Sequence, residues 1–314
     1  SISPATGPLT GGTVITINGL NLDGATKVTI GTTEVTTFAS LTDTTLVFAS
    51  PARAAGEAHI TVTTPGGTST ATSADLFTYV SRATVTSLSR TTAPLSGATL
   101  TITGTNFTGA TAVNFGLAAA TTFTVDNDTT ITATAPAGAK GTVDVTVTTS
   151  GGASSPSGTG NDFRYVDVPA ITSVTPSAGP IAGSQTVVIA GSEFVGVTEV
   201  LFGTEAATIE SVTDIAITVT TPAHEIGVVD VSLTTVGGST SATEAFRYYD
   251  VPTIDTVSPV RGPLAGTTVT ITGTNLLGVT AVSFGGTAAT TFVATSDSSI
   301  TVTAPARSAG TVTV

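Results

Sequence analysis

The stretch TTVTITGTNLLGVTAVSFGG, residues 267–286, decides the fold of this chain, because four versions of it occur along the sequence. The other versions are residues 12–31, 98–116 and 185–203. In the first half of the stretch Val269 and Ile271 alternate with threonines. A period of two with β-branched residues predicts a half-buried strand. One unit has been copied, and each copy is expected to fold in the same way.

The second half of the stretch predicts a shaped loop and another strand. Gly273 is followed five residues later by Gly278, and glycines at fixed offsets supply backbone conformations that a Cβ would penalise. Leu276, in the middle of that loop, is expected to tuck back under the sheet. Its counterparts in the other copies are Leu22, Phe107 and Phe194. The interpretation is a strand–loop–strand hairpin at the centre of every unit.

The spacing of the copies sets the number of domains. Pro8 to Pro94 is 86 residues, Pro94 to Pro180 is 86, and Pro180 to Pro263 is 83. Units of this size match a seven-stranded sandwich of about 100 residues and exceed the roughly 20–50 residues of a solenoid repeat. The predicted fold is therefore all-β, with four tandem sandwiches, each with its own core, in an elongated array.

The predicted domains are residues 1–81, 82–167, 168–250 and 251–314. The first lacks the opening residues that precede the third and fourth, and the fourth stops before its closing strand. The short joints between domains are expected to be semi-rigid, and two of them contain proline, at Pro169 and Pro252. Either residues follow Val314 and complete the fourth domain, or a strand from a neighbouring molecule does so.

The rest of each unit also repeats. A strand stops at a proline in every copy, the first of them Pro51, because proline cannot donate to a strand ladder. An alternating strand then leads to a Gly-Gly pair, such as Gly151-Gly152, which is a strong turn signal. A closing strand ends in Phe-x-Tyr, as at Phe163 to Tyr165.

Composition and charge exclude several classes of function. The chain has no Cys, Met or Trp and only 10% charged residues, against about 25% in a typical domain. A lack of oxidisable side chains suits an extracellular location. The net charge is −12 and the nine basic residues are scattered, so nucleic-acid or anionic-membrane binding is not expected. No apolar run is long enough for a membrane span, and no signal peptide opens the sequence.

No set of residues has the pattern of a catalytic site. The two histidines, His59 and His224, lack the partners of a triad or a zinc site. No pair of carboxylates recurs at equivalent positions, and no cofactor site is predicted. The segment 126–128, Asp-Asn-Asp, is interpreted as a polar turn. Asp167 and Asp250, which share a position in two joints, are weak candidates for calcium ligands.

Together these motifs resemble IPT/TIG domains over essentially the whole chain. The order is S-x-x-P and G-P-[LI], then I-x-G-x-[NE]-[FL]-x-G, then V-x-[FI]-G, S/A/T-P-A, Gly-Gly and F-x-Y. Unit two departs from it, because Arg90 replaces the proline found at Pro4 and Pro176. The resemblance implies immunoglobulin-like sandwiches and is nearly silent on function.

The function predicted is that of a non-catalytic extracellular structural protein, building the stalk or filament of a prokaryotic surface or adhesin-type assembly. Its expected partners are copies of itself or other surface proteins, with the open edge of the fourth domain as one contact. Two alternatives stay open. One is a spacer or carbohydrate-binding region of a secreted polysaccharide-active enzyme, and the other is a viral fibre or capsid-decoration protein.

Overall fold

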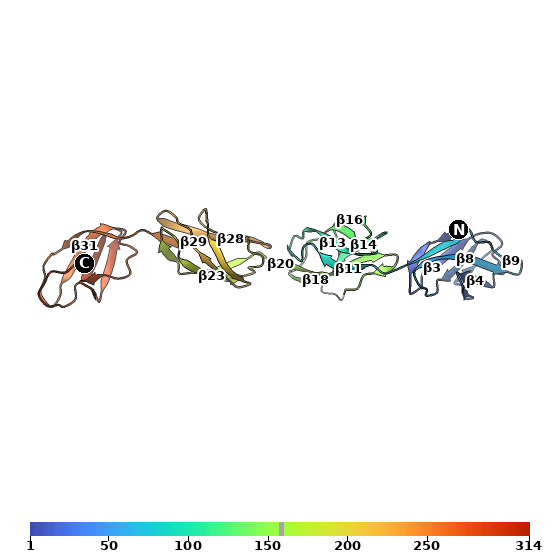
Figure 1. The fold of residues 1–314 in the computed structure, drawn as a ribbon, viewed down its shortest axis with the longest axis horizontal. Coiled ribbons are helices and arrows are strands. Elements are labelled where there is room, and N and C mark those ends of the chain that lie inside the picture. Colours follow the sequence, from blue (N-terminus) through green and yellow to red (C-terminus); the bar gives the residue numbers. More distant parts are fainter. Residues whose placement is uncertain (157–159) are drawn as a thin grey trace. The chain divides into compact units, whose positions relative to one another are not determined.

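Each repeat forms its own pair of packed β-sheets in the computed structural model, which describes residues 1–156 and 160–314 (Figure 1). By internal contacts the chain divides into two compact units, residues 1–167 and 168–314, and each unit holds two repeats. The all-β prediction and the prediction of four tandem immunoglobulin-like sandwiches are confirmed.

The first three domains share one topology. In the first, a four-stranded sheet has the order β1-β3-β7-β6, with bounds Ile2–Ser3, Val14–Asn18, Thr45–Ala49 and Ser40–Leu41. Its second sheet has the order β2-β10-β8-β4-β5, with bounds Thr6–Pro8, Leu76–Val80, Gly56–Thr64, Lys27–Ile30 and Thr33–Val35. A short β9 (Gly67–Thr68) pairs with β8, and a 3-10 turn, η1, spans Ser73–Asp75.

The second and third domains repeat this plan. In the second, β11-β13-β17-β16 are Thr84–Leu88, Thr99–Thr105, Thr130–Thr134 and Thr122–Asn127. Its other sheet, β12-β20-β18-β14-β15 with β19, has bounds Thr92–Pro94, Asp162–Val166, Gly141–Thr149, Ala112–Phe115, Ala118–Ala119 and Gly152–Ala153. In the third, β21-β23-β27-β26 are Ala170–Thr175, Thr186–Ser192, Ala216–Thr220 and Thr208–Thr213. Its other sheet, β22-β29-β28-β24-β25, has bounds Ala178–Pro180, Gly238–Tyr249, Gly227–Thr235, Glu199–Phe202 and Glu205–Ala206.

The fourth domain has the same first sheet and only part of the second. Strands β30-β31-β35-β34 are Thr253–Ser258, Thr268–Thr274, Ser299–Thr303 and Phe292–Ser296. The remaining pair is β32 (Ser283–Phe284) with β33 (Thr287–Ala288). The Gly285 amide donates to the Thr313 carbonyl, as the Gly203 amide does to Asp230 in the third domain. The last residues of the chain therefore lie where β28 runs in the complete domain.

The two strands of the repeated stretch do not form the hairpin that the sequence predicted. In the second domain β13 lies in one sheet and β14 in the other. The loop between them crosses from sheet to sheet, and Phe107 at its centre is fully buried. The two strands therefore face each other across the core, so the hairpin prediction is wrong. The prediction that the loop's central apolar residue tucks under the sandwich is confirmed, since Leu22, Phe194 and Leu276 are also at least 93% buried.

Each repeat has a separate hydrophobic core. Among the residues that the structure describes, four clusters of buried side chains lie within residues 15–79, 83–165, 187–248 and 269–302, and none includes a residue of a second repeat. The Phe-x-Tyr strand supplies the largest members in the complete domains, and in the second domain Phe163 lies edge-on to both Phe115 and Tyr165. The tyrosine hydroxyl donates to the carbonyl of the strand-ending proline, from Tyr165 to Pro136 at 2.9 Å. In each of the three complete domains the tyrosine contact lies within a single repeat.

One glycine of the repeated stretch is required by a close approach of the backbone. A Cβ on Gly191 would lie 1.9 Å from the Ala170 carbonyl oxygen of the neighbouring strand. Gly104 and Gly273 face the same obstacle.

Candidate functional site

The first candidate, His59, is used to hold a local turn. Its Nδ1 lies 2.7 Å from Asp75 Oδ1, and the Asp75 carboxylate also accepts from the Thr72 hydroxyl at 2.9 Å. Thr72 is the N-cap of η1, so the contacts clamp that turn onto β8. The Thr72 hydroxyl bonds to the carboxylate and not to the imidazole. The arrangement therefore lacks the nucleophile–base contact that acyl transfer needs.

The stability of the first domain should fall at acid pH because of Asp75. Burial raises the pKa of its carboxyl, but hydrogen bonds from His59 and Thr72 outweigh burial and lower that pKa below its ordinary value of 3.8. A lowered pKa in the folded state adds stability above the unfolded pKa, and that stability is lost as pH falls through the folded value. We expect the melting temperature of the first domain to drop below about pH 4.

Thermal unfolding monitored between neutral and acid pH checks this expectation. Asp75→Asn should flatten the acid drop, while the same change at Asp23, an exposed aspartate of the same domain, should leave it in place. An equal acid drop in wild type and Asp75→Asn would contradict the assignment.

The second histidine, His224, packs against the closing strand of the third domain. Its ring stacks on Tyr248 with centroids 4.9 Å apart, and its Nδ1 lies 2.9 Å from the Glu225 carbonyl oxygen. Burial raises the pKa of Tyr248 to about 12, so this phenol stays protonated at neutral pH. Neither ring is placed to act as a base. Arg53, Gly138 and Arg307 occupy the equivalent position in the other domains.

The aspartates singled out as calcium candidates lie at the ends of their domains. Asp250 is exposed, and its Oδ1 accepts from the Val251 amide at 2.7 Å, while Asp167 is half-buried. In the 126–128 turn, Asp126 and Asp128 accept from the hydroxyls of Thr132 and Thr108. Within residues 1–156 and 160–314, no three His, Asp or Glu side chains gather closely enough to hold a metal ion.

Two asparagines that sequence reasoning missed hold the joints. Asn106 and Asn275 have φ of 58° and 56°, the left-handed region in which asparagine is tolerated. The Asn106 side-chain amide donates to the Arg82 carbonyl at 3.0 Å, and Asn275 donates to Val251 at 3.2 Å. Each amide thus binds the joint to the domain that follows. In the sequence these asparagines stand in the G-x-[NE] motif, but only the structure shows the carbonyl groups to which they donate.

Removing this amide should loosen the joint and destabilise the second domain. Asn106→Gly keeps the left-handed backbone and loses the hydrogen bond, so we expect a cost of about 1 kcal/mol in the free energy of unfolding. Asn106→Ala should cost more, because alanine also disfavours positive φ. Asn21 has a φ of 56°, but in the described chain its side chain makes no hydrogen bond, so Asn21→Gly is the control with little effect. Denaturant unfolding measures all three, and equal losses for Asn21→Gly and Asn106→Gly would contradict this role.

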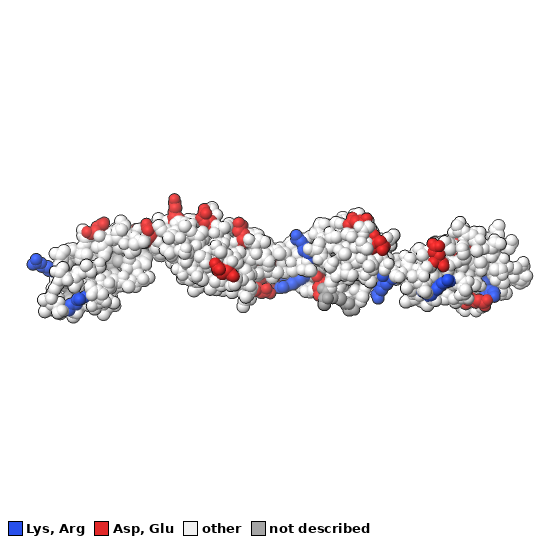
Figure 2. Space-filling model, viewed as in Figure 1, with Lys and Arg blue, Asp and Glu red and all other residues white. Residues whose placement is uncertain are grey.

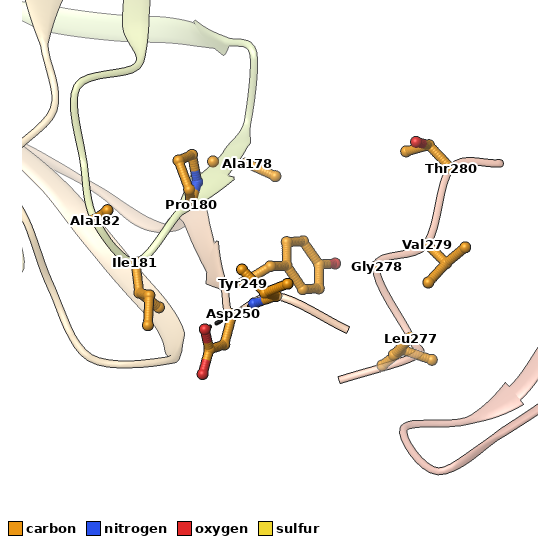
Figure 3. Close-up of a pocket in the computed structure, with 12 residues that line it drawn as sticks. Ala178, Pro180, Ile181, Ala182, Tyr249, Asp250, Leu277, Gly278, Val279 and Thr280 are labelled. Carbon is orange, nitrogen blue, oxygen red and sulfur yellow. Dashed lines mark hydrogen bonds between the residues drawn. The ribbon is translucent and has the colours of Figure 1, made fainter. Parts of the chain in front are cut away.

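A shallow groove of about 780 Å³ in the unit of residues 168–314 is the candidate binding site. Its walls are the end of β22 with the loop that follows, including Pro180 and Ile181, and the loop at residues 277–280 (Figure 3). The ring of Tyr249 lies between them and packs on Gly278, where a Cβ would come within 2.5 Å of the ring. The Arg247 guanidinium lies 5.6 Å from the ring centroid.

The groove has no catalytic arrangement among its described residues. Its lining is mostly apolar, with Asp250 as the charged group. Tyr249 is the tyrosine not used in a core, because Tyr79, Tyr165 and Tyr248 are each at least 98% buried. Sequence reasoning missed it, since Tyr249 directly follows the Phe-x-Tyr motif and reads as part of that strand.

On the visible face the lysines and arginines are scattered and form no basic patch (Figure 2). Among the residues that the structure describes, no helix has the length and apolar character to cross a bilayer.

Comparison with known proteins identifies the repeat. The family model described as "IPT/TIG domain" matches residues 1–79, 83–165, 169–248 and 252–314. Fibrocystin-L of Homo sapiens is 34% identical over 119 residues, which are 37% of this chain and 3% of that protein. The chain thus spans only a small part of this curated relative.

Two solved structures are among those similar to this chain. The extracellular region of plexin A4 is 19% identical with a TM-score of 0.38, and covers 97% of this chain and 28% of its own. SGBP-B from a xyloglucan utilisation locus of Bacteroides uniformis is 21% identical with a TM-score of 0.29, and covers 61% of each chain.

Proposed function

The chain belongs to the IPT/TIG family, and we propose that it is a non-catalytic extracellular structural array, part of the stalk or filament of a prokaryotic adhesin-type surface assembly. Tandem immunoglobulin-like domains of this kind are typical of extracellular structural or binding proteins. The proposed partners are further copies of this chain or other surface proteins.

One observation carries the proposal: each of the four hydrophobic cores is built within a single repeat. Domains with separate cores can be joined in any number and need no shared active site. The residues at the joints then set how the array bends. The polar groups that could have built a site serve local structure instead, as His59 does for η1 and Asn106 does for its joint.

Immunogold labelling of intact source cells tests the location and role. Antibodies raised against the first and third domains should label the cell surface without permeabilisation. Labelling that appears only after permeabilisation would contradict an extracellular stalk. An antibody against a cytoplasmic protein of the same cells is the control for membrane integrity.

The proposed array works without a bound metal or cofactor. A ligand that binds only the folded state raises stability by mass action. Since no calcium site is proposed, we expect the melting temperatures of the domains to be the same with added calcium and with EDTA. A rise with calcium that Asp250→Asn abolishes would instead establish Asp250 as a ligand. Asp255→Asn, at an exposed position in the next domain, is the matched control.

A second candidate, a carbohydrate-binding or spacer region of a polysaccharide-active enzyme, is favoured by Tyr249. The Tyr249 ring packs on Gly278 in the groove. An aromatic ring offers an apolar face and tyrosine adds a polar hydroxyl, which together could contact a sugar. Titration calorimetry with soluble β-glucan oligosaccharides tests it. Leu264→Ala, at an exposed apolar position outside the groove lining, is the control. Binding that is lost in Tyr249→Ala and kept in Leu264→Ala would support this candidate, and no heat in the wild type would reject it.

A further inference from the structure

Two of the seven asparagines stand in the pattern Asn-x-Thr, in which the asparagine side chain can accept a glycan on a secreted protein. One pattern begins at Asn106 and reads Asn-Phe-Thr, and the other begins at Asn127 and reads Asn-Asp-Thr. Both lie in the second domain. The pattern alone makes them equivalent, whereas their surroundings in the folded domain are different.

Asn127 lies at an exposed corner of the second domain. It is the last residue of β16 and pairs with Thr130 across the turn formed by Asp128 and Thr129. Strand β16 is at the edge of its sheet, in the order β11-β13-β17-β16. Asn127, Asp128 and Thr129 are all exposed. A sugar attached to the Asn127 side chain would therefore extend into solvent and displace no packed group.

The hydrogen bonds of the Asn127 side chain leave its nitrogen free. The Thr129 backbone amide and the Thr129 hydroxyl both donate to Asn127 Oδ1, at 2.9 and 2.8 Å. A backbone N–H can only donate, so the side-chain oxygen must be the atom that faces it. Within the described residues, Asn127 Nδ2 makes no hydrogen bond. The nitrogen that would carry the sugar is thus available, and the threonine that the pattern requires contacts the same side chain.

The surroundings of Asn106 do not suit a glycan. Asn106 is half-buried, and its Nδ2 donates to the Arg82 carbonyl at 3.0 Å, so a sugar there would have to fit at the joint. The Thr108 hydroxyl donates to Asp128 Oδ1 at 2.8 Å and not to Asn106. Phe107, the middle residue of this pattern, is fully buried. The folded domain therefore offers only one of its two patterns.

The turn itself does not require an asparagine. At the equivalent position the other domains have Thr42, Thr213 and Ser296, each before the aspartate whose carbonyl accepts from the amide of the buried loop residue. The side-chain oxygens there accept from turn amides, as Thr213 does from Ala216 at 3.0 Å and Ser296 does from Ser298 at 3.2 Å. A side-chain oxygen is sufficient to satisfy the turn. What asparagine adds is the amide nitrogen.

We propose that Asn127 is a glycosylation site, to which an enzyme of the producing cell attaches a sugar. The donor is a sugar activated at its anomeric carbon by a phosphate-linked carrier. The bond between Asn127 Nδ2 and the anomeric carbon forms as the bond from that carbon to the phosphate oxygen breaks. The phosphate leaves with the electron pair, and Nδ2 gives up one proton. This inference rests on the proposed extracellular location, because the Asn-x-Thr modification belongs to secreted proteins.

Peptide mapping by mass spectrometry, on the chain purified from the surface of its source cells, tests the proposal. No lysine or arginine lies between Arg90 and Lys140, so trypsin would leave both patterns on one peptide. Chymotrypsin separates them by cutting after Phe115. We expect a sugar mass on the peptide that contains Asn127 and the unmodified mass for the peptide that contains Asn106.

Variants produced in the same cells show which atoms are needed. Asn127→Ser keeps a side-chain oxygen for the turn, as at Ser296, and should lose the sugar. Thr129→Ala should also lose it, whereas Thr129→Ser, which preserves the pattern, should keep it. Asn106→Gly is the matched control and should keep the sugar. Thermal unfolding confirms that each variant is folded, and if Thr129→Ala is not, Asn127→Ser decides the question.

Several results would overturn the inference. They are an unmodified Asn127 in the chain taken from the cell surface, a sugar on Asn106, or a sugar that persists in Asn127→Ser. The surface-labelling experiment uses a separate readout, so surface labelling together with an unmodified Asn127 would overturn this inference and leave the proposed extracellular array intact. Labelling found only after permeabilisation would overturn the proposed array, whatever the peptide map shows.

Discussion

Gly191→Ala is expected to destabilise the third domain by about 3 kcal/mol, the upper end of the usual cost of inserting an atom where none fits. The added Cβ would come within 1.9 Å of the Ala170 carbonyl oxygen and 2.5 Å of the Phe194 ring. Because backbone lies on one side of the added Cβ and a buried ring on the other, the surrounding structure has little room to relax around it. Strand β21 would have to move away from β23, and the hydrogen bonds between them would weaken.

The chain contains its own control for this substitution. Ser192 follows Gly191 in β23 and is exposed, so Ser192→Ala is expected to be near neutral. Denaturant unfolding of the full chain, followed by probes specific to each domain, measures both. Similar losses at Ser192 and Gly191 would contradict the role of the close approach.

Phe163→Ala is expected to cost the second domain about 3–5 kcal/mol, because it empties a fully buried site. The ring also makes edge-to-face contacts, with centroids 5.0 Å from Phe115 and 5.1 Å from Tyr165, which add to the loss. Since the cores are separate, only the transition of the second domain should move. Phe123→Ala, at a half-buried position of the same domain, should cost less.

Differential scanning calorimetry of the full chain reads out both phenylalanine variants. One transition should shift by several degrees in Phe163→Ala while the others stay in place. A common shift of every transition would mean that the repeats share a core, which would contradict the fold described here.

Alternation and repetition were sufficient to predict the strands and the buried loop residues. Ile102 and Leu100 point inward because the strand has a period of two, and Phe107 is buried because the loop offers no other apolar anchor. The crossing between sheets was not predictable from the same pattern. Two alternating strands joined by a short loop have the same sequence pattern whether they pair side by side or face each other across a core.

The candidate sites were less predictable, because they depend on partners distant in sequence. Asn106 binds a carbonyl 24 residues away, and Tyr249 gains its role from Gly278 in the next repeat. The prediction that His59 and His224 build no triad or zinc site rested on the lack of suitable partners in the sequence. The structure adds the local contacts that the two side chains make.

Single-molecule pulling on the full chain tests the central idea that every repeat stands on its own core. Our account predicts separate unfolding events, with each complete domain releasing a length that corresponds to the roughly 80 residues of one repeat, at about 3.3–3.6 Å per residue. Phe163→Ala should lower the force of one event and leave the others unchanged. A single event that extends the whole chain at once would contradict it.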